Sequence, residues 1–163
     1  MKYSDSFYEI VDDILKCSEF DKLKLYTHHG ITRHEHCLRV AYYTYIVCKK
    51  LHLNYIEATR AALLHDFFTD EVSNLNAWGR FRNHPTYALI NAKKYFEISD
   101  LQENIIVRHM FPITFIPPKY IESWIVDIID DVSAIYDKAY SIRKQLVTAF
   151  NSIVIFVISL FKI

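Results

Sequence analysis

Histidines and one His-Asp pair are the residues of this chain best suited to chemistry. The chain holds eight histidines, and His65 directly precedes Asp66 at the end of a small, apolar segment that begins at Glu57. An imidazole and a carboxylate at the end of a buried helix need partners, because burying unpaired polar groups is costly. A divalent metal ion is an efficient partner, since neutral imidazole gives it a nitrogen and aspartate can give one oxygen to each of two ions. A capped helix end with a local hydrogen bond is the alternative that this pair alone leaves open.

Further histidines and aspartates stand on both sides of the pair. Glu35-His36-Cys-Leu-Arg-Val-Ala41 precedes it, and Asp130 follows in a later apolar helix. This order of His, then His-Asp, then Asp resembles the HD-domain metal-dependent phosphohydrolases. His84, in Asn-His-Pro, and His109, in Val-Arg-His-Met-Phe-Pro, resemble the variant of that superfamily that has two extra histidines and a dinuclear site. The Pro-Pro-Lys-Tyr-Ile-Glu-Ser-Trp stretch after His109 is also similar to small single-domain bacterial members. The whole resemblance covers roughly residues 25–137.

The resemblance implies a set of metal ligands. One divalent ion would be bound by His36, His65, Asp66 and Asp130, and Asp66 would bridge to a second ion held by His84 and His109. Such a donor set suits Fe, Mn, Co, Ni or Zn, and it leaves open whether one or two ions bind.

The choice of Asp130 depends on its place on a helix. By helical spacing, Asp130 lies over Val126 and Ala134, on a stripe of apolar and small residues. Asp131 lies one turn from Asp127, on a face typical of solvent. The family pattern supports Asp130, and Asp127 stays open as its substitute.

The chemistry implied is hydrolysis of a phosphate ester, of a nucleotide or of another small phosphorylated metabolite. A water shared by two cations loses a proton near neutral pH, and the same ions bind phosphoryl oxygens. We assign catalysis to Asp66 and, as a proton shuttle one helical turn later, to Asp70, for which capping the end of that helix is the alternative role. Four basic residues near the ligands are candidates for binding the phosphate: Arg33, Arg80, Arg82 and Lys119. Whether the substrate is a monoester or a diester stays open.

Composition excludes several other classes of function. The chain of 163 residues has only two glycines, too few for a G-x-G-x-x-G fingerprint, and it has no Walker A phosphate loop. Its formal net charge is zero, so the basic surface expected for binding a nucleic-acid duplex is absent. Its three cysteines form no C-x-x-C pair, and its first residues are polar, which together indicate reduced thiols in a cytoplasmic protein.

The elements that must position these residues are helices. Strand-like alternation is absent, and apolar residues recur at helical spacing, which predicts an all-α bundle of about seven helices. The first helical pattern runs from Ser6 to Lys16, and Gly30-Ile-Thr32 later interrupts the helical spacing. Thr32 with Glu35 forms a capping box for a helix over residues 33–51. Further helix starts are predicted at Asn54, at Asn83 with Pro85 in the first position, at Asp100 and at Lys119, the last helix running to about Tyr140.

The chain divides into an HD-type helical domain, residues 1–140, and a hydrophobic C-terminal extension, residues 141–163. We expect the extension to form a helix packed on the domain or on a second subunit, with a short membrane anchor as the alternative. That tail also motivates a second hypothesis for function, a non-catalytic HD-like module that binds a nucleotide or a partner, with membrane association through the tail. The oligomeric state is left open.

Overall fold

The fold is all-α, as the sequence predicts. The computed structural model describes residues 3–28 and 31–161, and the side chains of His28 and of residues 153–161 lie outside that description. The described helices are α1 (Asp5–Leu15), α2 (Ser18–Asp21), the 3-10 helix η1 (Lys22–Leu25), α3 (Arg33–Lys50), α4 (Tyr55–Leu64), α5 (Ala77–Tyr95), α6 (Asp100–Arg108) and α7 (Ile121–Phe161). Two strands of two residues each, β1 (Thr27–His28) and β2 (Ile31–Thr32), pair in antiparallel fashion between η1 and α3.

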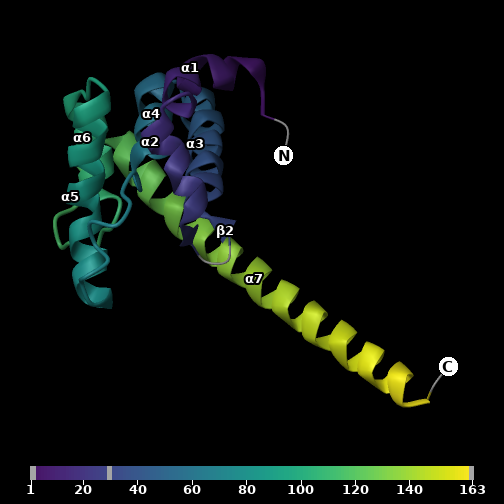
Figure 1. The fold of residues 1–163 in the computed structure, drawn as a ribbon. Coiled ribbons are helices and arrows are strands. Elements are labelled where there is room, and N and C mark those ends of the chain that lie inside the picture. The colour runs from purple at the N-terminus through teal and green to yellow at the C-terminus, as the bar shows by residue number, and fades with distance from the viewer. Residues whose placement is uncertain (1–2, 29–30, 162–163) are drawn as a thin grey trace.

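The helices α3 and α4 form the centre of the bundle (Figure 1). The helix α3 packs on α4 and on the first part of α7, and α4 packs in turn on α1 and α6. Ala58, Ala61 and Ala62 of α4 are fully buried, and their small side chains let neighbouring helices approach closely. Large apolar residues such as Phe7 and Phe20 complete the core from α1 and α2.

Two helix starts fall where local capping chemistry predicts them. The Thr32 hydroxyl accepts from the backbone N–H of Glu35 at 3.2 Å, and the Glu35 carboxylate accepts from the backbone N–H of Thr32 at 3.0 Å. Asn54 likewise caps α4 by accepting from the backbone N–H of Glu57 at 3.3 Å. These caps fix where α3 and α4 begin and so which way their histidines face. Gly30, predicted to interrupt the pattern before α3, lies outside the described residues.

The predicted start of α5 at Asn83 is wrong. The helix begins at Ala77, because Asn76 accepts from the backbone N–H of Gly79 at 2.7 Å and so caps it seven residues earlier. Pro85 therefore lies inside the helix, where it lacks the N–H that would bond the carbonyl one turn back. Within the same helix, the Asn83 side chain donates to the carbonyl of Gly79 at 2.7 Å.

The cap of α6 is also one residue from its predicted place. Ser99, rather than Asp100, is the N-cap, and it forms a capping box with Gln102. Asp100 is the first helical residue, where a negative charge near the helix N-terminus is still favourable.

The last helix, α7, does not end near Tyr140 but continues to Phe161. Its first part packs on the domain, and its second part projects away from it (Figure 1). All described side chains of residues 142–152 are exposed, so this segment does not pack on the domain of its own chain, and packing on a second subunit stays a prediction. No helix in the described part of the chain is long and apolar enough to cross a membrane. The boundary near residue 140 stays a prediction.

Candidate metal centre

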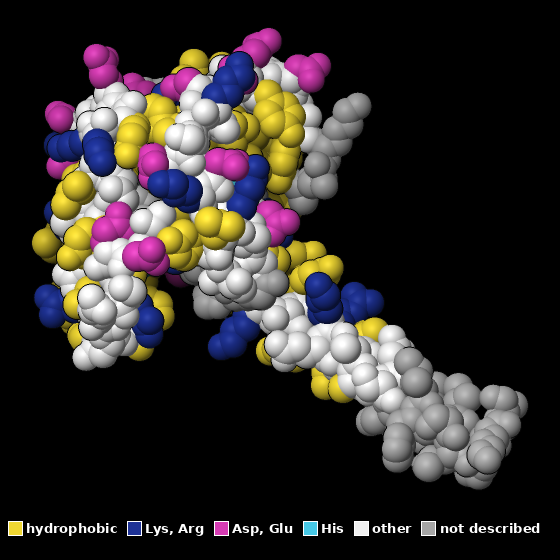
Figure 2. Space-filling view, viewed as in Figure 1, with side chains coloured by type: hydrophobic (Ala, Val, Ile, Leu, Met, Phe, Trp, Pro, Cys, Tyr) yellow, Lys and Arg dark blue, Asp and Glu magenta, His cyan; other side chains and the backbone are white. Residues whose placement is uncertain are grey.

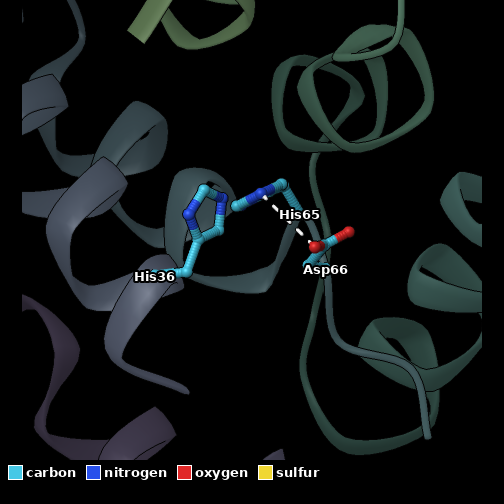
Figure 3. A group of neighbouring side chains, drawn as sticks. All are labelled: His36, His65 and Asp66. Atoms are coloured by element: carbon cyan, nitrogen blue, oxygen red, sulfur yellow. Dashed lines mark ion pairs between the residues drawn. The ribbon is translucent and has the colours of Figure 1, made fainter. Parts of the chain in front are cut away.

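Six side chains from five helices or helix ends converge near the middle of the bundle. His36 lies in the second turn of α3, His65 and Asp66 follow the last residue of α4, and His84 lies in α5. His109 follows α6, and Asp130 lies in the first part of α7. All six are buried, with at most 9% of the residue exposed. Figure 3 shows His36 beside the His65 ring, with Asp66 joined to His65 by an ion pair of 4.0 Å.

Three of the histidines form hydrogen bonds to backbone carbonyls through their Nδ1 atoms. The Nδ1 of His65 lies 2.7 Å from the Ala62 oxygen, that of His84 lies 2.9 Å from the Arg80 oxygen, and that of His109 lies 2.8 Å from the Ile106 oxygen. A carbonyl oxygen only accepts, so each Nδ1 carries the hydrogen. In the neutral form, the Nε2 atom of each ring is then left with its lone pair for an electrophile.

Two of these nitrogens face each other. The Nε2 atoms of His84 and His109 are 2.9 Å apart, and the Asp66 Oδ1 atom lies 3.3 Å from the first and 3.8 Å from the second. Two nitrogen lone pairs at this distance repel each other unless they share a cation. The nearby carboxylate makes a trio of donors, which suits a metal ion better than a proton alone.

A second set of contacts gathers around His36. Its Nε2 atom lies 2.7 Å from Asp130 Oδ1, and the Nε2 atom of His65 lies 3.4 Å from the same oxygen. On the far side of the ring, the Nδ1 atom of His36 lies 3.0 Å from Asp137 Oδ2. The Asp137 carboxylate is fully buried and is paired with Arg39. A carboxylate behind an imidazole is the usual way to orient a metal-binding histidine.

The electrostatics of the cluster suit a cation. Burial acts to raise the pKa of Asp130, but His65 and His36 outweigh it and hold that pKa well below its usual range. Burial, together with His65 and His84, lowers the pKa of His109 to about 3, so His109 is neutral at physiological pH. Burial acts to lower the pKa of His65, but Asp130 and Asp66 raise it overall, so a proton competes with a metal there.

Donor atoms of the six residues fall into three overlapping groups that could each hold a metal ion. In each group the donor atoms lie within 4.8 Å of one another. The groups are His36, His65 and Asp66; His65, His109 and Asp130; and Asp66, His84 and His109. The residues therefore fit a divalent metal, and the sharing of His65, Asp66 and His109 between groups is compatible with one or two ions.

A cavity of about 410 Å³ opens beside this cluster, and both Asp66 and Asp130 line it. Two arginines, Arg33 and Arg80, also line the cavity. Arg33 is buried; it donates to the Phe68 carbonyl at 2.5 Å, and its guanidinium lies 3.7 Å from the centre of the Phe68 ring. The Arg33 guanidinium is thus held by Phe68 in the wall of the cavity beside the candidate metal centre.

Several residues proposed from the sequence lie elsewhere. Arg82 lines a separate cavity of about 160 Å³, and Lys119 lines another of about 270 Å³ beside α6. Asp70 is exposed, accepts a hydrogen bond from the Tyr26 hydroxyl at 3.0 Å and is not among the residues lining the cavity of the cluster. The structure does not bring these three side chains to that cavity.

Asp127, the substitute for Asp130, is buried but belongs to none of the three donor groups. Burial and the neighbouring Asp131 raise its pKa to about 7. Of these two aspartates of α7, Asp130 is the one that contacts His36 and His65.

Sequence reasoning missed Asp137 and Arg39. Asp137 is seven residues after Asp130, two helical turns along the same face of α7, and that spacing was the available signal. Its partners lie on α3, 101 positions earlier for His36, so the contact itself depends on tertiary packing.

Comparison with known proteins agrees with this geometry. The HD domain family matches residues 33–135, a span that includes all six residues of the cluster. The chain therefore belongs to the HD domain family, a superfamily of metal-dependent phosphohydrolases whose domains bind divalent metals. No curated protein and no solved structure matches the chain.

Proposed function

We propose that the protein is a metal-dependent phosphohydrolase that acts on a small phosphate ester, of a nucleotide or of another phosphorylated metabolite. The observation that carries the proposal is the 2.9 Å approach of the Nε2 atoms of His84 and His109, whose Nδ1 hydrogens are both engaged elsewhere. Membership of the HD domain family gives this arrangement its chemical context.

The proposed metal ligands are His36, His65, Asp66, His84, His109 and Asp130, with Asp66 between the two halves of the cluster. A divalent cation in such a site supplies a Lewis acid that activates water and stabilises charge on phosphoryl oxygens. Asp137 orients His36, and backbone carbonyls orient the other three histidines. The protein's part is thus to hold the donor atoms in place before substrate binds.

The cavity beside the cluster suits the substrate. Its volume of about 410 Å³ lies within the usual range for small-molecule sites. Arg33 and Arg80 would pair with the phosphate, because guanidinium groups bind phosphoryl oxygens through charge-assisted hydrogen bonds. Phe68, Phe81 and Ile113 would contact the organic part of the substrate and exclude water from it.

A cytoplasmic location forms part of the proposal. Cys17, Cys37 and Cys48 are all free thiols, which is typical of a reducing compartment.

The test is hydrolysis by metal-free protein reloaded with Mn²⁺, Fe²⁺, Co²⁺, Ni²⁺ or Zn²⁺, measured over a panel of nucleotides, sugar phosphates and an aryl phosphate. We expect metal-dependent release of phosphate, or cleavage of a diester, that H65A abolishes. H52N is the matched control, because His52 is exposed, lies outside the cluster and has a φ of 57°, which asparagine tolerates. Tight binding of a nucleotide without turnover under any metal would favour the non-catalytic module instead.

A further inference from the structure

The outer face of α7 carries a regular apolar pattern that the single chain leaves uncovered. Apolar residues follow one another at alternating steps of four and three residues: Ile128, Val132, Ile135, Ala139, Ile142, Leu146 and Ala149. All seven are exposed, and the five large ones are between 50% and 70% exposed. In the sequence the same steps continue at Ile153, Phe156 and Leu160. We call the seven residues from Ile128 to Ala149 the α7 seam.

The seam lies opposite the face that packs on the domain. Val126, Asp130, Ser133 and Asp137 are buried against the bundle, and each lies roughly on the other side of the helix from a seam residue. Packing within the chain therefore fixes the inner face of α7 and leaves the outer one free. Figure 2 shows hydrophobic side chains together with Lys and Arg on the part of α7 that projects beyond the domain.

A step pattern averaging 3.5 residues is the signature of a helix that pairs with another helix in a coiled coil. The seam spans 22 residues of helix, or about 33 Å. Covering it, with the flanking Tyr136 and Phe150, removes on the order of 700 Å² per copy, close to the roughly 800 Å² per partner of a standard stable interface. We propose that the seam is a dimer interface at which α7 packs antiparallel on α7 of a second copy of this chain.

Charge decides the orientation of the two helices. In a parallel coiled coil, a residue that flanks the apolar core lies against the residue five positions further along the partner helix. This brings Lys138 against Arg143 of the partner subunit. Like charges at that distance repel. The parallel arrangement is therefore disfavoured.

Charge also selects one antiparallel register. When Ala139 packs against Ile142 of the partner subunit, Lys138 meets Gln145 of the partner subunit and Tyr136 meets Arg143 of the partner subunit. The first pair carries no like charges, and the second is a favourable cation–π pair. A shift of one heptad in one direction brings Lys138 against Lys138 of the partner subunit, and a shift in the other direction brings Arg143 against Arg143 of the partner subunit. Both shifts therefore place like charges together.

The same register covers a groove on the domain. An apolar cavity of about 450 Å³ lies between α3 and α7, lined among others by Tyr43, Val47 and Ile129. In this register Phe150 of the partner subunit meets Ile129 and enters the groove. The seam and the groove then form one continuous apolar surface, buried by one partner helix.

The first test is the mass of the full chain in solution, by sedimentation velocity at micromolar concentration. We expect a dimer for the wild type and for K144E, whose substitution lies on the other side of the helix, and a monomer for L146E. Leu146 is 66% exposed, so L146E should keep its circular dichroism and thermal unfolding, which separates loss of the dimer from loss of the fold. A monomeric wild type would overturn the proposal, as would an L146E variant that stays dimeric.

The second test reads the orientation through disulfide formation. In a C17S background, A139C and I142C chains are mixed and mildly oxidised, and we expect the mixed A139C–I142C disulfide to predominate. Self-linked A139C would indicate parallel helices and overturn the register.

A third test, flotation with phosphatidylglycerol vesicles, asks whether a membrane rather than a second copy covers the α7 seam. A chain that is monomeric in solution and that binds the vesicles would overturn the dimer, and loss of this binding in L146E would assign the seam to a lipid surface.

Discussion

The Nδ1 atom of His36 lies 3.0 Å from Oδ2 of Asp137, although the two residues stand 101 positions apart in the chain. This contact joins α3 to α7 and lies directly behind one edge of the candidate metal centre. Asp137 is completely buried, and its charge is balanced by Arg39. The pair therefore connects the packing of α7 on the domain to the orientation of a proposed metal ligand.

Replacing Asp137 should weaken metal binding without removing a ligand. We expect D137N to lower the affinity for a divalent metal by about 10- to 100-fold, because the orienting carboxylate behind His36 becomes a neutral amide. The measurement is titration of metal-free protein by calorimetry. Thermal unfolding of the metal-free variant serves as the control for folding, and an unchanged metal affinity would show that Asp137 has only a packing role.

Arg80 and Arg82 form a matched pair for testing the substrate cavity. Arg80 lines the cavity beside the cluster and Arg82 lines a different one, although both are exposed residues of α5. We expect R80A to raise KM for a phosphate ester by about tenfold, the equivalent of one charge-assisted hydrogen bond, and R82A to leave KM unchanged. Equal effects of the two substitutions would contradict the placement of the phosphate.

The cysteines should differ sharply in reactivity. Burial raises the pKa of the Cys48 thiol to about 12 and that of the Cys37 thiol well above its usual value, whereas Cys17 is only partly buried. The thiolate is the reactive form, so N-ethylmaleimide at pH 8 should label Cys17 quickly and the other two only in denaturant. Mass spectrometry of the native protein and of C17S counts the labelled sites, and rapid labelling of C17S would contradict this burial pattern.

An ion pair between α1 and α4 should give a pH-dependent contribution to stability. Arg60 donates to Asp13 at 2.6 Å and 2.7 Å, and this hydrogen bonding lowers the pKa of Asp13 from 3.8. A lowered folded-state pKa means that the contribution is complete above pH 3.8 and is lost as the pH falls through the folded-state value. We expect R60M to reduce the free energy of unfolding by about 1 kcal/mol at pH 7, since Asp13 is half-exposed and solvent screens the pair.

Urea unfolding at pH 7 and at pH 3 measures this contribution. The difference between R60M and wild type should shrink at pH 3. A difference that stays constant with pH would assign the effect to the hydrogen bond that Arg60 also donates to the Ile10 carbonyl at 2.8 Å.

Local chemistry explains which helix starts could be predicted. Thr32 and Asn54 cap their helices through contacts three residues away, so the sequence contains the whole signal. The start of α5 was misplaced because Pro85 is typical of a first helical position, whereas here the helix tolerates it in its interior. Asn76 carried the correct signal, a side chain able to cap three residues ahead, but Gly79 weakened the helical pattern there.

The sequence predicted only those site residues that match the ligand order of the HD-domain family. The order of histidines and aspartates predicted six residues that the structure brings together. Asp137 was missed because its role comes from α7 packing on α3. The sequence could not separate Arg80 from Arg82, because sequence distance does not say which side of α5 faces the cavity. The apolar sequence of the extension predicted that it is buried, whereas residues 142–152 are exposed in the single chain, and we propose that a second copy covers their apolar face.

The central claim is that the buried histidines and aspartates hold a divalent metal. The most direct test is the metal content of the purified protein, measured by inductively coupled plasma mass spectrometry. The protein should contain one or two equivalents of a transition metal per chain, H65A and D130N should lose most of it, and H52N should retain it. A wild-type protein that stays metal-free after incubation with Mn²⁺, Fe²⁺, Co²⁺, Ni²⁺ and Zn²⁺ would contradict the account, as would H65A and D130N variants with the metal content of the wild type.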